Sequence, residues 1–185
     1  MATSLRLIFW GFVLVLVDVR LGTVDVLPDF AGYGMVAIGA GQLAAEAAAF
    51  RTARLVAWAM VAPGLLDAVV PLQAAPLAGI IEALGQAALL WYLLTGIADW
   101  TAAEGRPDLA AGARRRRAAS VVLLAVVLGL RLLDSGGGAS RDVAVVVVFL
   151  DLVLMGMVLQ LIHRVRAELD PGAGVSRPAA YRPGG

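Results

Sequence analysis

Two carboxylates in this 185-residue chain are the residues with the clearest potential for chemistry. Glu82 lies in the apolar segment 76–98 and Asp151 in the segment 143–163, roughly 9 Å and 13 Å from the segment starts if both are helical. A charge at the centre of a hydrocarbon layer costs about 2.5–3.5 kcal/mol, so we expect both acids to face protein or a water cavity. Acids at graded depth could exchange protons or hold a cation, which predicts an ion or proton pathway.

Two further side chains bear on this pathway. Gln86 follows Glu82 by four residues and shares its helix face. Arg131, three residues before Asp134, is a candidate ion-pair partner for Glu82 or Asp151. The alternative interpretation is a satisfied polar network that fixes helix register, with Arg131 neutralising one acid.

Shallower acids stand near the ends of the apolar segments. Asp29, Asp67 and Asp134 would attract cations to that side, although solvated turns also tolerate Asp freely. The chain has no Cys, and its acids match no metal-binding loop motif, so neither a metal nor a cofactor is expected. No catalytic set is recognisable, and an enzyme acting on lipid is the least favoured function.

The composition predicts where these residues sit. Hydrophobic residues make up 61% of the chain, charged residues only 16%, and the mean hydropathy is +0.86. Such values are typical of membrane proteins. The expected fold is an all-α integral membrane protein with six transmembrane helices over residues 1–166 and a disordered cytoplasmic tail over 167–185. The spans are expected at about 5–21, 28–49, 55–70, 76–98, 118–133 and 143–163.

The placement of arginine gives the expected topology. All 15 basic residues are Arg, and most fall on the side that also holds both termini. The positive-inside rule therefore predicts cytoplasmic N- and C-termini. The absence of Lys, together with much Ala and Gly, is typical of a GC-rich bacterial genome, so the expected location is a bacterial plasma membrane. The cluster Arg114, Arg115, Arg116 and Arg117 is interpreted as a topology anchor or as a site for anionic lipid headgroups. Nucleic-acid binding is not expected.

The spans pair as three helical hairpins, each with an Asp near the outer end of its first helix. This pattern is compatible with an internal repeat around an axis along the membrane normal, and the alternative is that outer helix ends simply tolerate Asp. Small residues in the second segment form a surface for close helix packing or for assembly into a homo-oligomer. These residues are Gly32, Ala37, Gly39, Gly41 and Ala45.

Residues 9–44 carry the motif LPDF-x-GY at Leu27, Pro28, Asp29, Phe30, Gly32 and Tyr33. This stretch resembles the opening of small uncharacterised bacterial multi-pass membrane proteins. The resemblance implies a short first span, an outer loop with Asp and a Gly-containing second helix, but no activity.

Two functions follow as hypotheses. The first is a small transporter or channel-like protein that moves protons or cations through its carboxylates. The alternative is a structural or partner-binding membrane protein whose polar groups serve packing and assembly.

Overall fold

The computed structural model describes residues 2–16, 20–21, 24–25, 29–69, 76–134 and 141–169. The prediction of an all-α fold with six helices is confirmed, apart from one short β-ribbon between the first two helices. The helices are α1 (Ala2–Leu16), α2 (Asp29–Gln42), α3 (Ala48–Val69), α4 (Pro76–Ala103), α5 (Pro107–Asp134) and α6 (Arg141–Leu169). The ribbon pairs β1 (Arg20–Leu21) antiparallel with β2 (Val24–Asp25).

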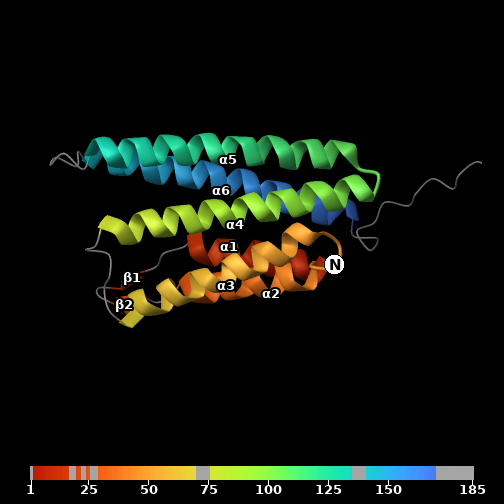
Figure 1. Cartoon of the computed structure of the whole chain (residues 1–185), viewed down its shortest axis with the longest axis horizontal. Helices are drawn as coiled ribbons and strands as arrows, with labels where there is room; N and C mark the ends of the chain where they lie inside the picture. Colours follow the sequence, from red (N-terminus) through yellow and green to blue (C-terminus); the bar gives the residue numbers. More distant parts are fainter. Residues whose placement is uncertain are drawn as a thin grey trace, which may run out of the picture.

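Helices that are neighbours along the chain pack against each other, and a contact between α1 and α6 closes the bundle. In Figure 1, α1, α2 and α3 lie together on one side of the molecule, and α4, α5 and α6 on the other. The core between them is apolar, and its largest fully buried side chains include Phe12, Tyr33, Phe50 and Leu89. Burial of these groups is the main favourable contribution to folding.

The reversal between α4 and α5 follows from a local sequence signal. Gly105 adopts a φ of 72°, a left-handed conformation that glycine takes without steric cost. The amide of Arg106 donates to the carbonyl of Thr101 at 2.8 Å, and that of Gly105 donates to Ala102 at 3.1 Å. This is a Schellman cap, and Pro107 then starts α5 at a position that needs no amide hydrogen.

Glycines let α1 and α2 approach each other closely. A Cβ atom added to Gly32 would lie 2.6 Å from the carbonyl oxygen of Gly11, and one added to Gly39 would lie 2.7 Å from that of Ser4. At the same end of the pair, the hydroxyl of Ser4 donates to Oε1 of Gln42 at 2.8 Å. The two backbones are therefore in direct contact over several turns.

The prediction of six transmembrane helices is wrong for the described part of the chain. There, one helix is long and apolar enough to cross a membrane, Ile80–Ala103, with a mean hydropathy of 1.5; Thr3–Leu16 is apolar but shorter. Helix α2 has 14 residues, about 21 Å, against roughly 30 Å of hydrocarbon, and α5 contains the cluster Arg114–Arg117. The predictions of a multi-pass protein, of a plasma-membrane location and of a repeat axis along a membrane normal are therefore wrong as well.

The observed helices differ from the predicted spans mainly in where they begin and end. The segment 28–49 was expected to be one helix, but α2 ends at Gln42 and a turn leads to α3 at Ala48. Conversely, α4 extends beyond the predicted span 76–98 to Ala103, and α5 starts at Pro107, well before the predicted span 118–133. The predicted tail begins within α6, which extends to Leu169, and the rest of the tail lies outside the described residues.

Candidate functional site

One polar arrangement on the bundle surface joins α5 to α4. The guanidinium of Arg117 lies over the ring of Trp91, with its central carbon 4.6 Å from the ring centroid. Nη1 of Arg117 donates to the hydroxyl of Thr95 at 2.9 Å, and that hydroxyl donates to the carbonyl of Trp91 at 2.7 Å. A hydroxyl has one hydrogen and two lone pairs, so Thr95 fills both roles at once. We call Arg117, Trp91 and Thr95 the arginine clamp.

Arg116 points to the other neighbour of α5. Its Nε donates to the carbonyl of Met157 on α6 at 2.8 Å, and Nη2 donates to Oε1 of Gln160 at 3.4 Å. Nη1 returns to the carbonyl of Gly112 at 3.4 Å. Desolvation, together with the charge of Arg164, lowers the pKa of Arg116 from its ordinary value. Its guanidinium thus ties α5 to α6.

The arginine cluster that the sequence treats as one unit therefore divides into parts. Arg114 and Arg115 are exposed, whereas Arg116 and Arg117 are half-buried against neighbouring helices. Sequence reasoning missed Trp91 and Thr95. The available signal was their spacing of four residues, which places an aromatic ring and a hydroxyl on one helix face.

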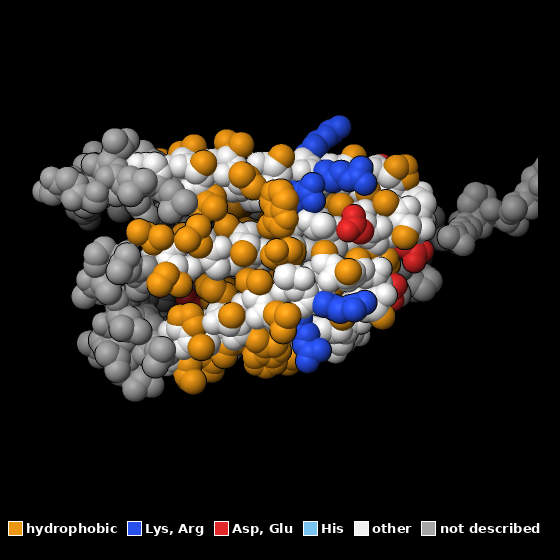
Figure 2. Space-filling model, in the orientation of Figure 1, with side chains coloured by type: hydrophobic (Ala, Val, Ile, Leu, Met, Phe, Trp, Pro, Cys, Tyr) orange, Lys and Arg blue, Asp and Glu red, His pale blue; other side chains and the backbone are white. Residues whose placement is uncertain are grey.

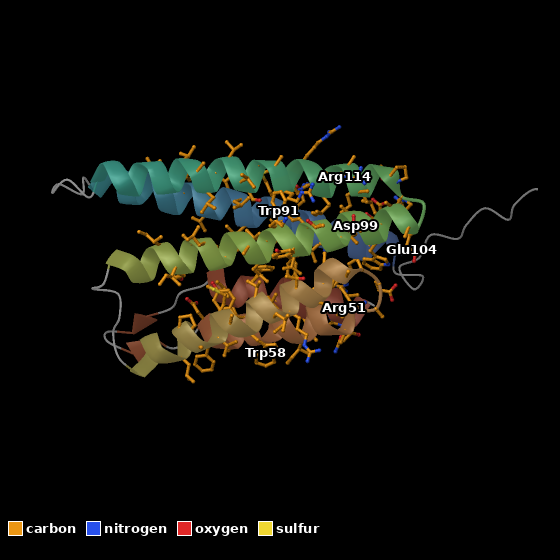
Figure 3. All side chains as sticks on the ribbon, viewed as in Figure 1. Arg51, Trp58, Trp91, Asp99, Glu104 and Arg114 are labelled. Atoms are coloured by element: carbon orange, nitrogen blue, oxygen red, sulfur yellow. The ribbon has the colours of Figure 1, made fainter. Side chains whose placement is uncertain are left out.

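The surface around the clamp is ordered along the length of the bundle. Figure 2 shows many hydrophobic side chains on this face, interspersed with other groups, and a band of arginines nearer one end, with acidic side chains among and beyond the arginines. In Figure 3, Trp58 and Trp91 lie at one level, Arg51 and Arg114 lie farther toward that end, and Glu104 lies beyond them. An apolar zone therefore gives way to aromatic residues and then to a charged zone, in which Asp99 lies at the level of Arg51 and Arg114.

An ion-pair network closes the acidic end. Arg106 at the α4–α5 turn pairs with Asp108 at 3.4 Å and with Glu168 near the end of α6. Arg164 pairs with Glu168 at 2.8 Å and with Asp108 at 3.8 Å. Desolvation acts to raise the pKa of Asp108, but the Leu109 amide and the Arg106 guanidinium outweigh it and lower that pKa. The network fixes the end of α6 to the turn.

Tyr33 is the most unusual titratable group in the core. Its side chain is 2% exposed, and its hydroxyl has no hydrogen-bond partner in the described part of the chain. Burial raises its pKa, and the negative charges of Glu82 and Asp29 raise it further. The phenol is therefore held in its neutral form.

The predicted pathway residues occupy several helices. Glu82 is exposed and Gln86 half-buried on α4, and Asp29 is half-buried in the first turn of α2. Four others lie in helices, but their side chains are outside the described residues: Asp67 in α3, Arg131 and Asp134 in α5, and Asp151 in α6. A convergence of Glu82, Asp151 and Arg131 stays a prediction.

The predicted packing residues also differ in their surroundings. Gly32 and Gly39 face α1, whereas Ala37 is fully buried. Gly41 lies beside the side chain of Arg54, and Ala45 is exposed in the turn after α2. Across the described ranges, no group of three His, Cys, Asp or Glu side chains is placed to hold a metal ion.

Comparisons with known proteins assign the chain to no family. The resemblance of residues 9–44 to small bacterial multi-pass membrane proteins therefore stays a prediction. No family model matches the chain, and no curated protein or solved structure shows significant similarity to it.

Proposed function

We propose that this protein is a helical bundle whose binding partner is lipid, which its exposed apolar surface contacts. Large hydrophobic side chains are exposed on all six helices, and we call this set the apolar girdle. It consists of Trp10, Ile38, Leu55, Trp58, Leu65, Ile81, Leu84, Trp91, Val121, Val122, Val126, Val146, Phe149, Leu152, Val153 and Met157. Large contiguous apolar patches mark sites of interaction with proteins or membranes, whereas scattered single residues do not.

The extent of the girdle follows from helix geometry. Ile81 and Trp91 bound it on α4 and are roughly 15 Å apart along the axis, and Val146 and Met157 bound it on α6 at a similar separation. Asp99 lies about 12 Å beyond Trp91. Glu82 interrupts the girdle beside Ile81. The apolar surface is thus a band with a charged border on the side of the arginines.

The observation that carries the proposal is the order of residues at this border. Tryptophan is enriched where hydrocarbon meets headgroups, and each arginine near an anionic lipid surface contributes about 1 kcal/mol to attraction. Trp58 and Trp91 lie at one level beside the arginine band, as Figure 3 shows. A protein partner would cover one face of the bundle, but the exposed residues come from every helix.

The transport hypothesis is not carried forward. It depends on six membrane spans, and the described helices contradict that arrangement. The arginine clamp and the apolar girdle instead support binding to lipid, and both consist of described side chains.

Vesicle flotation tests the proposal. We expect the wild-type chain to float with phosphatidylcholine vesicles, and a variant with Leu55→Ser, Ile81→Ser and Phe149→Ser to float much less. These side chains are 68%, 62% and 63% exposed, so their loss removes girdle surface with little effect on the core. Ala103→Ser, at an exposed site beyond the arginine band, serves as the control.

Two results would contradict the proposal. One is a wild-type chain that stays with the unbound fraction. The other is a defined oligomer that forms without lipid and dissociates in the triple variant, which would assign the girdle to assembly between copies of the chain.

A further inference from the structure

We infer that the arginine clamp is a binding site for the phosphate of an anionic lipid headgroup. This inference rests on the proposed contact between the girdle and lipid, and it assigns headgroup recognition to one arginine of the cluster. The carrying observation is that Arg117 is held in place by Trp91 and Thr95, at the edge of the girdle.

The guanidinium is positioned before any ligand arrives. The central carbon of the guanidinium lies 4.6 Å from the centroid of the Trp91 ring, and Thr95 accepts a hydrogen bond from one of its nitrogens. The Thr95 hydroxyl is itself held by the carbonyl of Trp91 one helical turn earlier. A side chain ordered in this way loses less conformational freedom on binding, which favours affinity.

Donors remain for a phosphate after these contacts are made. A guanidinium carries several N–H donors in a planar fork, and the hydrogen bond to Thr95 uses only Nη1. Phosphate oxygens match this fork in a two-point hydrogen-bonded pair. Asp99 lies one turn beyond Thr95 and forms no ion pair with Arg117, so the charge is not neutralised there.

The neighbouring arginines do not share this arrangement. Arg116 directs its guanidinium to carbonyl and amide oxygens of the bundle, which gives it a structural role. Arg114 and Arg115 are exposed and act as diffuse positive charge. Trp91 is 40% exposed and belongs to the girdle, so a headgroup above the clamp would have its acyl chains beside apolar side chains.

The test measures binding of the full chain to phosphatidylcholine vesicles with and without phosphatidylglycerol. We expect wild-type binding to rise with phosphatidylglycerol, and Arg117→Gln to reduce that gain by more than the about fivefold that loss of one diffuse arginine charge would cause. Arg117→Lys keeps the charge but loses the planar fork, so it recovers only part of the gain. Trp91→Leu keeps an apolar side chain in the girdle and also reduces the gain.

Arg115→Gln is the matched control, because it removes the same charge from an exposed site on the same helix. Equal losses in Arg115→Gln and Arg117→Gln would overturn the clamp and leave only diffuse charge. Thermal unfolding of each variant by circular dichroism shows whether the bundle stays intact.

The remaining outcomes separate the inference from the proposed function. Arg117-dependent binding of inorganic phosphate without any gain from phosphatidylglycerol would assign the clamp to free phosphate and overturn a lipid headgroup. Binding to phosphatidylcholine, with a gain from phosphatidylglycerol that is the same in wild type, Arg117→Gln and Trp91→Leu, would overturn the clamp and keep the girdle. Absence of binding to either vesicle would overturn both.

Discussion

The hydroxyl of Tyr33 is a polar group buried in an apolar core without a partner among the described residues. A buried donor left unpaired costs about 1–3 kcal/mol of stability. The aromatic ring more than offsets this cost, because a large buried ring removes much apolar area from water. The hydroxyl is therefore dispensable for folding, and its titration gives a direct measure of its burial.

We predict that Tyr33→Phe leaves the bundle as stable or more stable, by about 1 kcal/mol. Because the pKa of Tyr33 in the folded state is raised above its ordinary value of 10.0, wild-type stability is fully present below pH 10 and falls as pH rises further. The unfolded chain loses the phenol proton first, which favours unfolding. The variant should lack this part of the alkaline loss.

Thermal unfolding between neutral and alkaline pH checks this prediction. The chain has three tyrosines, no Cys and, by its sequence, no Lys, so tyrosine is the only side-chain type that ordinarily titrates near pH 10. Tyr92→Phe, at a half-buried site, is the control. The same alkaline slope in wild type and in Tyr33→Phe would refute the burial of this hydroxyl.

The arginine cluster shows what a sequence can and cannot tell at this scale. Its charge density and its position on a helix are readable from Arg114 to Arg117. Its division into exposed, structural and clamped side chains depends on Trp91 of α4 and Met157 of α6, which are distant along the chain. Spacing rules relate residues within one helix and give no information about a neighbouring helix.

Helices α1 and α2 are in backbone contact at Gly32, and α2 also contains a glycine that serves as a matched control. An added Cβ at Gly32 would meet the backbone of α1, which cannot move aside as the end of a side chain can. Gly34, two residues later on the same helix, has nothing within 4 Å of an added Cβ.

We predict that Gly32→Ala destabilises the bundle by about 1–3 kcal/mol, since the two helices must separate. Gly34→Ala should instead stabilise it by about 0.5–1 kcal/mol, because alanine is the better helix former and meets no obstacle. Denaturant unfolding of both variants provides the measurement. Equal effects of the two substitutions would show that α1 and α2 are not in backbone contact.

The ion-pair network at the end of α6 supports a second prediction for the elements. Glu168→Gln should weaken the attachment of α6 to the α4–α5 turn by at most about 1 kcal/mol, because Arg106 and Arg164 remain partly exposed. The pKa of Asp108 is lowered in the folded state, so its contribution is present above its ordinary pKa and is lost as pH falls through the folded value.

Amide hydrogen exchange at the C-terminal turns of α6 measures this attachment. We expect faster exchange there in Glu168→Gln at neutral pH, and a smaller difference from wild type in acid. Thr95→Ser, distant from the network, is a suitable control. Unchanged exchange in Glu168→Gln would mean that apolar packing alone holds α6.

The number of helices could be predicted from the sequence, but their limits could not. Apolar segments locate the six helices because each must bury an apolar stripe in the core. The reversal at Gly105 and Pro107 follows from local chemistry that hydropathy does not detect, and it is absent from the predicted spans. Hydropathy gives no sign of the continuation of α5 through Arg114–Arg117 either. Hydropathy falls at those arginines, but the helical hydrogen bonds continue because arginine is a good helix former.

For the whole molecule, the composition shows a high apolar content, but the prediction that this content forms six membrane spans is wrong. Much of it lies in the core, at residues such as Phe12 and Leu89, and the rest is exposed in the girdle. Hydropathy along a chain does not distinguish these two locations, since both consist of the same side chains. The distinction depends on which face of each helix meets its neighbours.

The four tryptophans give a test of the girdle and its border together. Trp58 and Trp91 are 46% and 40% exposed at one level of the bundle, as seen in Figure 3, whereas Trp100 is 2% exposed in the core. Variants that retain one tryptophan each, with phenylalanine at the others, would be mixed with vesicles whose lipids carry bromine close to the headgroup. Bromine quenches indole fluorescence only at short range, so the emission reports contact with lipid.

We predict strong quenching of Trp58 and Trp91 and little quenching of Trp100, because interfacial aromatic rings sit at the headgroup level and a core residue does not. Quenching of Trp91 should also increase with phosphatidylglycerol, and this increase should disappear in Arg117→Gln, because that variant binds the anionic vesicles less tightly. Equal, weak quenching at all three positions would place the girdle away from lipid. Strong quenching of Trp100 would mean that the bundle opens on the vesicle, since its core position leaves no other route to lipid.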